Sequence, residues 1–320
     1  MMTKMKLTVI VPGYNNRIEL WRRCVESVIA AAERCDGGVE ILCVDDGSND
    51  GSGERLAAWV ETLDGGEKWC VKVIRQRNAG LAAARNAAIS VAHGEFVTFI
   101  DSDDEIADGT FAACLEQLTA TQSDVCFYGV KTIWFKDGLM KVDRPERRYY
   151  DTPTPTEVLS IFKADMLNYS CNKLYRRAFL DEHCLRFPID GMPCEDIIFN
   201  LEVIMAGAKY CSVDYVGYVY YRGATTILSS YCKTFTAGMR KASDTWKRYK
   251  DRTEGAREML GGLGEMSETA LERVEKRNLL RPHSPLWYAP IYQLVRRIVY
   301  IRPVRRWHLK RVFPTVEDWK

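Results

Sequence analysis

The sequence contains no long apolar run. None of its hydrophobic segments reaches the roughly 18–20 residues that a membrane-spanning helix needs, and residues 1–6 lack the apolar stretch of a secretory signal peptide. We therefore expect a chain that stays in the cytoplasm. Its 11 cysteines are scattered and include no C-x-x-C pair, which favours neither a disulfide framework nor a zinc site. Most of them are expected to be small buried hydrophobic residues.

Two common phosphate-binding loops are also missing. The sequence has no G-x-x-x-x-G-K-[ST] loop, and no G-x-G-x-x-G follows its first apolar segment. The sequence therefore does not favour a P-loop NTPase or a Rossmann dehydrogenase, since both bind phosphate through such a loop. The four histidines are far apart in the sequence, and we assign none of them to a metal site.

Charge is balanced overall but divided unevenly along the chain. The 320 residues carry 45 basic and 43 acidic side chains, which argues against a general nucleic-acid-binding protein. Residues 1–110 hold 12 basic and 18 acidic side chains, whereas residues 281–320 hold 9 basic and 2 acidic ones together with seven aromatic residues. This basic, aromatic tail predicts contact with an anionic membrane surface. The alternative is a C-terminal helix that packs on the rest of the protein.

Apolar strand patterns alternate with amphipathic helix patterns in the first hundred residues. Strands are expected at 7–12, 39–44, 71–74 and 95–100, and helices at 18–32, 51–63 and 80–92. This alternation predicts an α/β fold with a mainly parallel sheet flanked by helices. Further expected elements are a helix at 108–120 capped by Asp108, a strand at 125–134, a hairpin through Asp137–Gly138, helices at 154–164 and 195–206, and a strand at 213–221. After about residue 230 only helix patterns remain, so we expect a catalytic domain at 1–225 and a helical extension at 226–320.

Three polar clusters follow expected parallel strands, at the edge of an open α/β sheet where ligands bind. They are Pro12-Gly-Tyr-Asn15, Asp45-Asp-Gly-Ser48 and Asp101-Ser-Asp-Asp104. In the last cluster, Asp101 and Asp103 are separated by one residue and offer the oxygen ligands that Mg²⁺ and Mn²⁺ prefer. Without a phosphate-binding loop, such a metal suits a nucleoside diphosphate that is held through the cation and leaves during the reaction.

Five motifs together resemble the family 2 glycosyltransferases of the GT-A fold. They are Val9–Asn15, Val44–Ser52, Asn78–Asn86, Asp101–Asp104 and Glu195–Asp196, and the resemblance covers residues 5–222. It implies that a nucleotide-sugar donor is bound by Pro12, Tyr14, Asn15, Asp45, Asp46, Asn78, Gly80, Arg85, Asp101 and Ser102. It also implies that Asp103 and Asp101 hold Mg²⁺ or Mn²⁺. Two questions stay open: which of Asp45 and Asp46 contacts the base, and whether Arg85 neutralises phosphate or braces the aspartates.

The resemblance implies an inverting transfer in which Asp196, or its neighbour Glu195, is the general base. The donor is expected to be a UDP-sugar, and the acceptor a glycan or lipid-linked oligosaccharide of a cell-surface polysaccharide. Such an enzyme would work in the cytoplasm at the inner face of the membrane. Lys173 and Arg222 have two interpretations: they reach donor phosphates or an anionic acceptor, or they are a solvated lysine and a strand-end arginine.

Two other classes are considered. A sugar-1-phosphate nucleotidyltransferase should carry a glycine-rich N-terminal loop with basic residues, which residues 9–16 lack. A non-catalytic glycan-binding scaffold would be expected to have lost its carboxylates, yet Asp101, Asp103, Glu195 and Asp196 are all present.

Overall fold

The computed structural model describes residues 5–134, 139–150, 169–189 and 195–222. Three expected features lie outside these ranges: the turn at Asp137–Gly138, the helix at 154–164 and the extension at 226–320. Membrane contact through residues 281–320 therefore stays a prediction. Among the described residues, no helix is both long enough and apolar enough to span a bilayer.

Strands and helices follow one another in the expected order. The strands are β1 (Met5–Gly13), β2 (Gly38–Asp45), β3 (Trp69–Arg75), β4 (Phe96–Phe99), β5 (Glu105–Ile106), β6 (Val125–Trp134), β7 (Leu139–Asp143), β8 (Arg148–Tyr150), β9 (Lys173–Arg176) and β10 (Tyr210–Arg222). The helices are α1 (Ile18–Ala32), α2 (Ser52–Val60), α3 (Leu81–Val91), α4 (Thr110–Thr121), α6 (Arg177–Glu182) and α7 (Glu195–Met205). The helix expected at 51–63 ends early, because Thr62 and Leu63 make tighter bonds to carbonyls three residues back.

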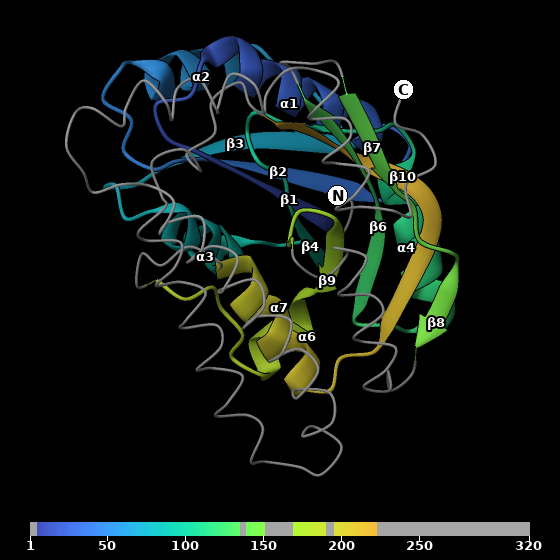
Figure 1. Ribbon diagram of the computed structural model, residues 1–320. Coiled ribbons are helices and arrows are strands. Elements are labelled where there is room, and N and C mark those ends of the chain that lie inside the picture. Colours follow the sequence, from blue (N-terminus) through green and yellow to red (C-terminus); the bar gives the residue numbers. More distant parts are fainter. Residues whose placement is uncertain (1–4, 135–138, 151–168, 190–194, 223–320) are drawn as a thin grey trace, which may run out of the picture.

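One mixed sheet joins the ten described strands (Figure 1). Eight of them follow the order β3-β2-β1-β4-β9-β6-β10-β5, and β7 and β8 pair beside β6 and β10. Strands β3, β2, β1 and β4 are parallel, as the alternating pattern predicts. Strand β9 runs antiparallel to both β4 and β6, whereas β6 and β10 are parallel. The expected hairpin partner is confirmed by β7, which pairs antiparallel with β6 so that Leu139 faces Trp134.

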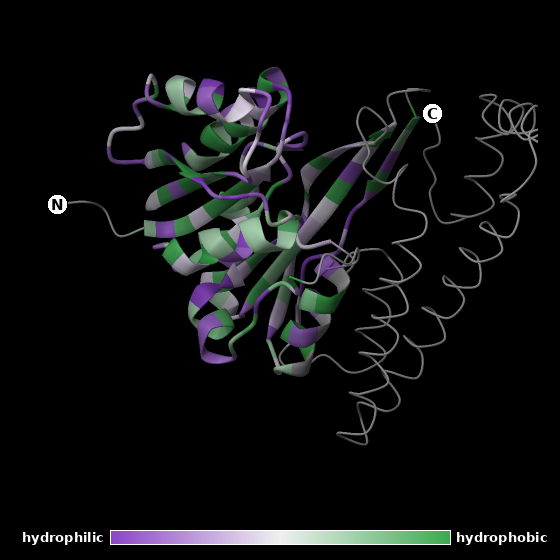
Figure 2. Cartoon of the chain, turned by 90° about the vertical axis from the view of Figure 1, so that its left-hand side faces the viewer, coloured by the Kyte–Doolittle hydropathy of each residue, from purple (hydrophilic) through white to green (hydrophobic). Residues whose placement is uncertain are grey.

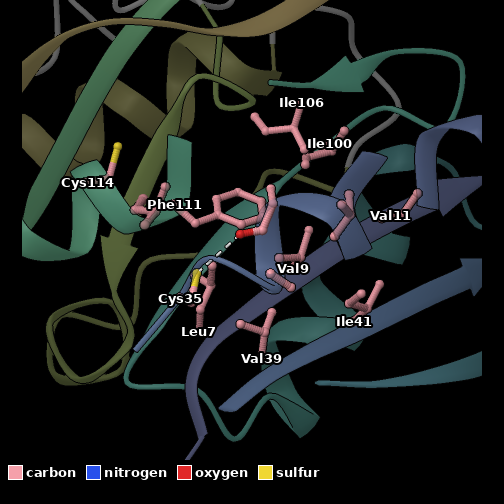
Figure 3. Packing of buried hydrophobic residues seen from close by; sticks show 14 of the residues in the cluster. Leu7, Val9, Val11, Cys35, Val39, Ile41, Ile100, Ile106, Phe111 and Cys114 are labelled. Carbon is pink, nitrogen blue, oxygen red and sulfur yellow. Dashed lines mark hydrogen bonds between the residues drawn. The ribbon is translucent and has the colours of Figure 1, made fainter. Parts of the chain in front are cut away.

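Helices cover both faces of the sheet, and each face has its own hydrophobic core. Helices α1, α2 and α4 pack on one face, and α3, α6 and α7 pack on the other (Figure 1). Because side chains alternate along a strand, Leu7, Val9 and Val11 of β1 enter the first core (Figure 3) and Ile10 enters the second. The helices carry both hydrophobic and hydrophilic residues (Figure 2), as amphipathic helices packed on a sheet do. Seven of the nine described cysteines are buried and all nine are free, which confirms their expected role.

The prediction that Asp108 caps the helix at 108–120 is wrong. Helix α4 begins at Thr110 after Gly109, whose φ of 81° is left-handed, and no side chain caps it. The Asp108 carboxylate instead forms an ion pair with Arg34 at 3.2 Å. The glycine turn directs this side chain away from the helix N-terminus and toward α1.

The buried carboxylate of Glu40 in β2 is the target of several hydrogen-bond donors. Thr8 Oγ1, Lys72 Nζ and the backbone N–H of His93 each donate to it at 3.0 Å, and its side chain is 1% exposed. Burial alone would raise the pKa of Glu40, but these hydrogen bonds outweigh burial and lower it.

Replacing Glu40 by Gln should lower the free energy of unfolding by about 1–3 kcal/mol at pH 7, because its three donors lose a buried, charged acceptor. A lowered folded-state pKa means that the carboxylate stabilises the fold above its unfolded-state pKa near about 4.3, and that this contribution is lost as pH falls through the folded-state value. Urea unfolding at pH 7 and at pH 3 should show a smaller difference between variant and wild type at pH 3. The exposed Glu61→Gln serves as the control, and equal losses at both pH values would contradict the prediction.

Candidate active site

The three polar clusters that follow the parallel strands meet at one edge of the sheet. The first two are joined by the hydrogen bonds Asp46 N to Gly13 O and Asn15 N to Ser48 Oγ, both at 2.9 Å. Asn16 Nδ2 reaches across to Ser102 and donates to its carbonyl at 3.0 Å and its hydroxyl at 2.9 Å. The structure therefore brings together Pro12, Tyr14, Asn15, Asp45, Asp46, Asp101, Ser102 and Asp103, as the sequence predicts.

Glycine at position 13 is required by the close packing at this edge. A Cβ atom there would lie 2.9 Å from Ser102 Oγ and from the ring of the buried Trp21. Beyond it, Tyr14 is 47% exposed, and Asn15 has a φ of 47°. Asn15 and Asn49 fix this turn by a reciprocal pair of hydrogen bonds at 2.9 and 3.0 Å. The Tyr14 ring therefore lies at the surface of the edge, where its face is available for stacking.

Asp45 and Asp46 both carry hydrogen bonds within the fold. Asp45 is fully buried and accepts from Ser48 N and from Arg75 Nε, each at 2.9 Å. Asp46 is 4% exposed and accepts from Gln76 Nε2 at 2.7 Å, Ala79 N at 2.9 Å and Gly80 N at 2.8 Å. Asp45 closes its own turn, whereas Asp46 fastens the 76–80 segment, which contains the predicted Asn78 and Gly80, to the sheet edge.

The Asp101–Asp104 turn presents its first and third residues and buries its fourth. Asp104 is fully buried and accepts from Tyr218 Oη at 2.7 Å and from Tyr221 N at 2.8 Å. Burial, followed by the charges of Asp101 and Asp103, raises the pKa of Asp104 well above its ordinary value. The Asp101 side chain is 36% exposed, Asp103 is half-buried, and Arg23 of α1 donates to the Asp103 carbonyl at 2.8 Å. Asp104 therefore ties this turn to the end of β10.

The donor set at this turn suits a hard divalent cation shared with a ligand. Asp101 and Asp103 offer carboxylate oxygens, which Mg²⁺ and Mn²⁺ prefer. The part of the chain that the structure describes contains no group of three or more His, Cys, Asp or Glu residues that could hold a metal ion. Two carboxylates match Mg²⁺ sites that are completed by substrate phosphates and water. The residues present therefore fit a cation that arrives with a phosphorylated donor.

Arg85 of α3 lies beneath the site and joins three carboxylates. Its guanidinium is 1% exposed and lies 3.0 Å from Asp101, 2.7 Å from Asp196 and 3.5 Å from Glu195. Burial alone would lower the pKa of Arg85, but the three carboxylates, Asp196 foremost, raise it. Of the two roles considered for Arg85, the contacts in the structure are those of the brace.

Asn86, the neighbour of Arg85, has a structural role that sequence reasoning missed. Its side chain donates to Phe187 O at 2.8 Å and accepts from Phe187 N at 2.9 Å. The Phe187 ring in turn lies 5.1 Å from the Arg85 guanidinium, close enough for a cation–π contact. The pair Arg85-Asn86 thus holds both the acidic cluster and the segment behind it, and its position at the end of the Asn78–Asn86 motif was the available signal.

Glu195 and Asp196 begin α7 and contact one guanidinium nitrogen of Arg85, whereas Asp101 contacts the other. Their side chains are 18% and 22% exposed. Burial and then the Asp196 charge raise the pKa of Glu195 to about 7, although Arg85 opposes them. Asp196 Oδ1 accepts from Arg85 at 2.7 Å and from Ser170 Oγ at 2.6 Å. Two carboxylates therefore stand next to the Asp101 turn, as a general base for an acceptor hydroxyl would require.

The interpretation of Lys173 as a solvated lysine is wrong. Its side chain is fully buried in β9 and donates to Asn172 Oδ1 at 2.7 Å and to the carbonyl of Tyr169. Burial lowers the pKa of Lys173 to about 7. A lysine at this depth does not reach a donor phosphate. Arg222 is the last residue of β10.

Comparison with solved structures supports the fold. Residues 1–349 of Staphylococcus aureus TarS in complex with UDP-GlcNAc match with a TM-score of 0.66 and 21% identity, over 89% of this chain and 78% of that one. A mannosyltransferase from Pyrobaculum calidifontis in complex with GDP-Man and Mn²⁺ matches with a TM-score of 0.59 and 17% identity, over 98% of this chain and 88% of that one. At these identities the likeness shows the fold, a mixed open sheet flanked by helices.

Sequence comparison identifies the family. The chain is 34% identical over 191 residues to the putative glycosyltransferase EpsH of Bacillus subtilis, a match that covers 58% of this chain and 51% of that relative. The chain thus spans about half the length of this relative. The family model described as glycosyl transferase family 2 matches residues 8–184, more than half of the chain. The chain therefore belongs to glycosyl transferase family 2.

Proposed function

We propose that this glycosyltransferase moves a sugar from a UDP-sugar to a hydroxyl group of a glycan or lipid-linked oligosaccharide, with inversion at the anomeric carbon. One observation carries the proposal: the Arg85 guanidinium forms ion pairs with Asp101 and also with Asp196 and Glu195. Asp101 lies at the sheet edge where the three polar clusters meet. A donor bound at that edge would place its sugar between the Asp101 turn and the start of α7. A relative named poly(ribitol-phosphate) β-N-acetylglucosaminyltransferase TarS supports a polymeric acceptor.

On the donor side, the exposed Tyr14 offers a ring face to a nucleotide base, and the 76–80 segment held by Asp46 borders the same edge. Asp103, with Asp101, would hold Mg²⁺ or Mn²⁺. When bound, that ion would neutralise charge on the departing diphosphate. Arg85 is buried against the carboxylates, so its part is to keep Asp101 in place rather than to contact the donor.

On the acceptor side, Asp196 is the proposed general base. Its Oδ1 atom is engaged by Arg85 and Ser170, which leaves Oδ2 to take the proton of the attacking hydroxyl. The oxygen so activated attacks the anomeric carbon from the face opposite the diphosphate. The bond to the diphosphate breaks in the same displacement, and the configuration inverts.

A panel of nucleotide-sugars tests the proposed function. Purified protein with Mg²⁺ or Mn²⁺ should release UDP from a UDP-sugar, faster in the presence of a lipid-linked or polymeric acceptor. Release is measured by a coupled diphosphate assay, with GDP-mannose included as the alternative donor. The proposal is wrong if no nucleotide-sugar yields a nucleoside diphosphate while sugar-1-phosphate and UTP yield pyrophosphate.

The replacement Asp196→Asn should lower kcat by about 10²–10⁴-fold, the usual contribution of a general base, and leave donor affinity within a factor of about two. Its matched control is Glu195→Gln, which neutralises the adjacent carboxylate and should lower kcat by less than about tenfold. Steady-state kinetics and calorimetric titration with UDP measure both effects. A larger loss of kcat in Glu195→Gln than in Asp196→Asn would assign the base to Glu195, whose pKa of about 7 suits that role.

Asp103→Ala should abolish the strengthening of UDP binding by Mn²⁺, because the cation loses one of its two proposed carboxylate ligands. Titrations with UDP in Mn²⁺ and in excess EDTA should differ for the wild type and coincide for the variant. Asp108→Ala, which removes an exposed carboxylate paired with Arg34, is the control and should retain the metal effect. Wild-type turnover by Asp103→Ala in excess EDTA would contradict a metal role at this turn.

A further inference from the structure

The buried segment 169–173 contacts α7 at two points that are one helical turn apart. Ser170 Oγ donates to Asp196 Oδ1 at 2.6 Å, and Asn200 Nδ2 donates to the Tyr169 carbonyl at 3.3 Å. Because residues four apart share one face of a helix, Asp196 and Asn200 both face this segment. Two contacts spaced in this way fix the rotation of α7 about its axis as well as its position.

The segment is itself held rigidly from behind. Ser170, Asn172 and Lys173 are fully buried. The Lys173 ammonium donates to the Tyr169 carbonyl, and Asn172 Nδ2 donates to Tyr128 O at 3.1 Å. Tyr128 Oη returns a hydrogen bond to Cys171 O at 2.9 Å. These bonds tie the segment to β6, so the Ser170 hydroxyl is presented to Asp196 from a fixed backbone.

Two donors therefore converge on one oxygen of Asp196. Arg85 and Ser170 both engage Oδ1, whereas none of the described residues donates to Oδ2. The carboxylate is 22% exposed. A carboxylate anchored through one oxygen cannot rotate freely, so the orientation of its other oxygen is set by the anchors. Arg85 also serves Asp101 and Glu195, which leaves Ser170 as the anchor directed to Asp196 alone.

We propose that Ser170, supported by Lys173 through the Tyr169 carbonyl, is a positioning residue that fixes Asp196 so that Oδ2 faces the acceptor hydroxyl. This inference rests on the proposed function and deepens it, because it assigns roles at the site to Ser170 and Lys173. Ser170 does not touch the reacting atoms. It acts through the orientation and the charged state of Asp196.

The test compares Ser170→Ala with Ser123→Ala. Ser123 is also fully buried, but its hydroxyl bonds to Thr121 Oγ1 at the end of α4, at 2.7 Å. Ser170→Ala should lower kcat by about 10–100-fold, the loss expected for a hydrogen bond to a charged group, with the donor KM unchanged. The acid limb of the kcat–pH profile should move to higher pH, because a donor that favours the charged carboxylate is gone. Ser170→Thr, which keeps the hydroxyl, should restore both kcat and the profile.

Ser170→Ala with the kcat and pH profile of Ser123→Ala overturns the positioning role, whatever its thermal stability. A lowered kcat with an unshifted acid limb also overturns it, because a structural defect alone gives that result. Wild-type kcat in Asp196→Asn would overturn the assignment of Asp196 as the base. That is a failure of the proposed function, and it is measured without the Ser170 variants.

Discussion

A single buried guanidinium contacts three carboxylates, and the arrangement of the site depends on it. Arg85 comes from α3, Asp101 follows β4, and Glu195 and Asp196 begin α7, so one cation connects three separate elements. Removing one partner of a buried ion cluster costs about 3–5 kcal/mol, because the charges that remain are left uncompensated. The docking of α7 against the sheet edge and the position of the Asp101 turn therefore depend on the same set of ion pairs.

The net charge of this cluster explains why the site suits a cation-bound donor. Three carboxylates around one guanidinium leave an excess of negative charge, to which the half-buried Asp103 adds. Three other acidic residues at this edge, Asp45, Asp46 and Asp104, are buried and accept hydrogen bonds from the chain, so they shape the loops of the edge. A divalent ion that arrives with a diphosphate would relieve the excess that remains.

The parallel strands, the helices between them and the polar edge at their carboxyl ends could be predicted, because each depends on local periodicity and on the rule that parallel strands end together. The roles of Arg85 and Lys173 could not. Arg85 is buried against carboxylates that include Asp196, which lies 111 positions away in the sequence yet 2.7 Å away in space, and Lys173 is buried with its hydrogen bonds accepted by the Tyr169 carbonyl and Asn172 Oδ1. Charged residues look alike in a sequence whether they are solvated or paired. For Arg85 the acidic partners on α7 are distant in the chain, and for Lys173 nothing in the neighbouring sequence shows that its side chain turns inward.

A double-mutant cycle on Arg85 and Asp196 tests the central claim most directly. The free energy of unfolding is measured by urea denaturation for the wild type, Arg85→Met, Asp196→Asn and the double variant. If the guanidinium holds the two sides of the site as one unit, the double variant should be more stable than additivity predicts, with a coupling energy of at least about 1.5 kcal/mol. Losses that add to within about 0.5 kcal/mol would contradict the account, because Arg85 and Asp196 would then contribute independently.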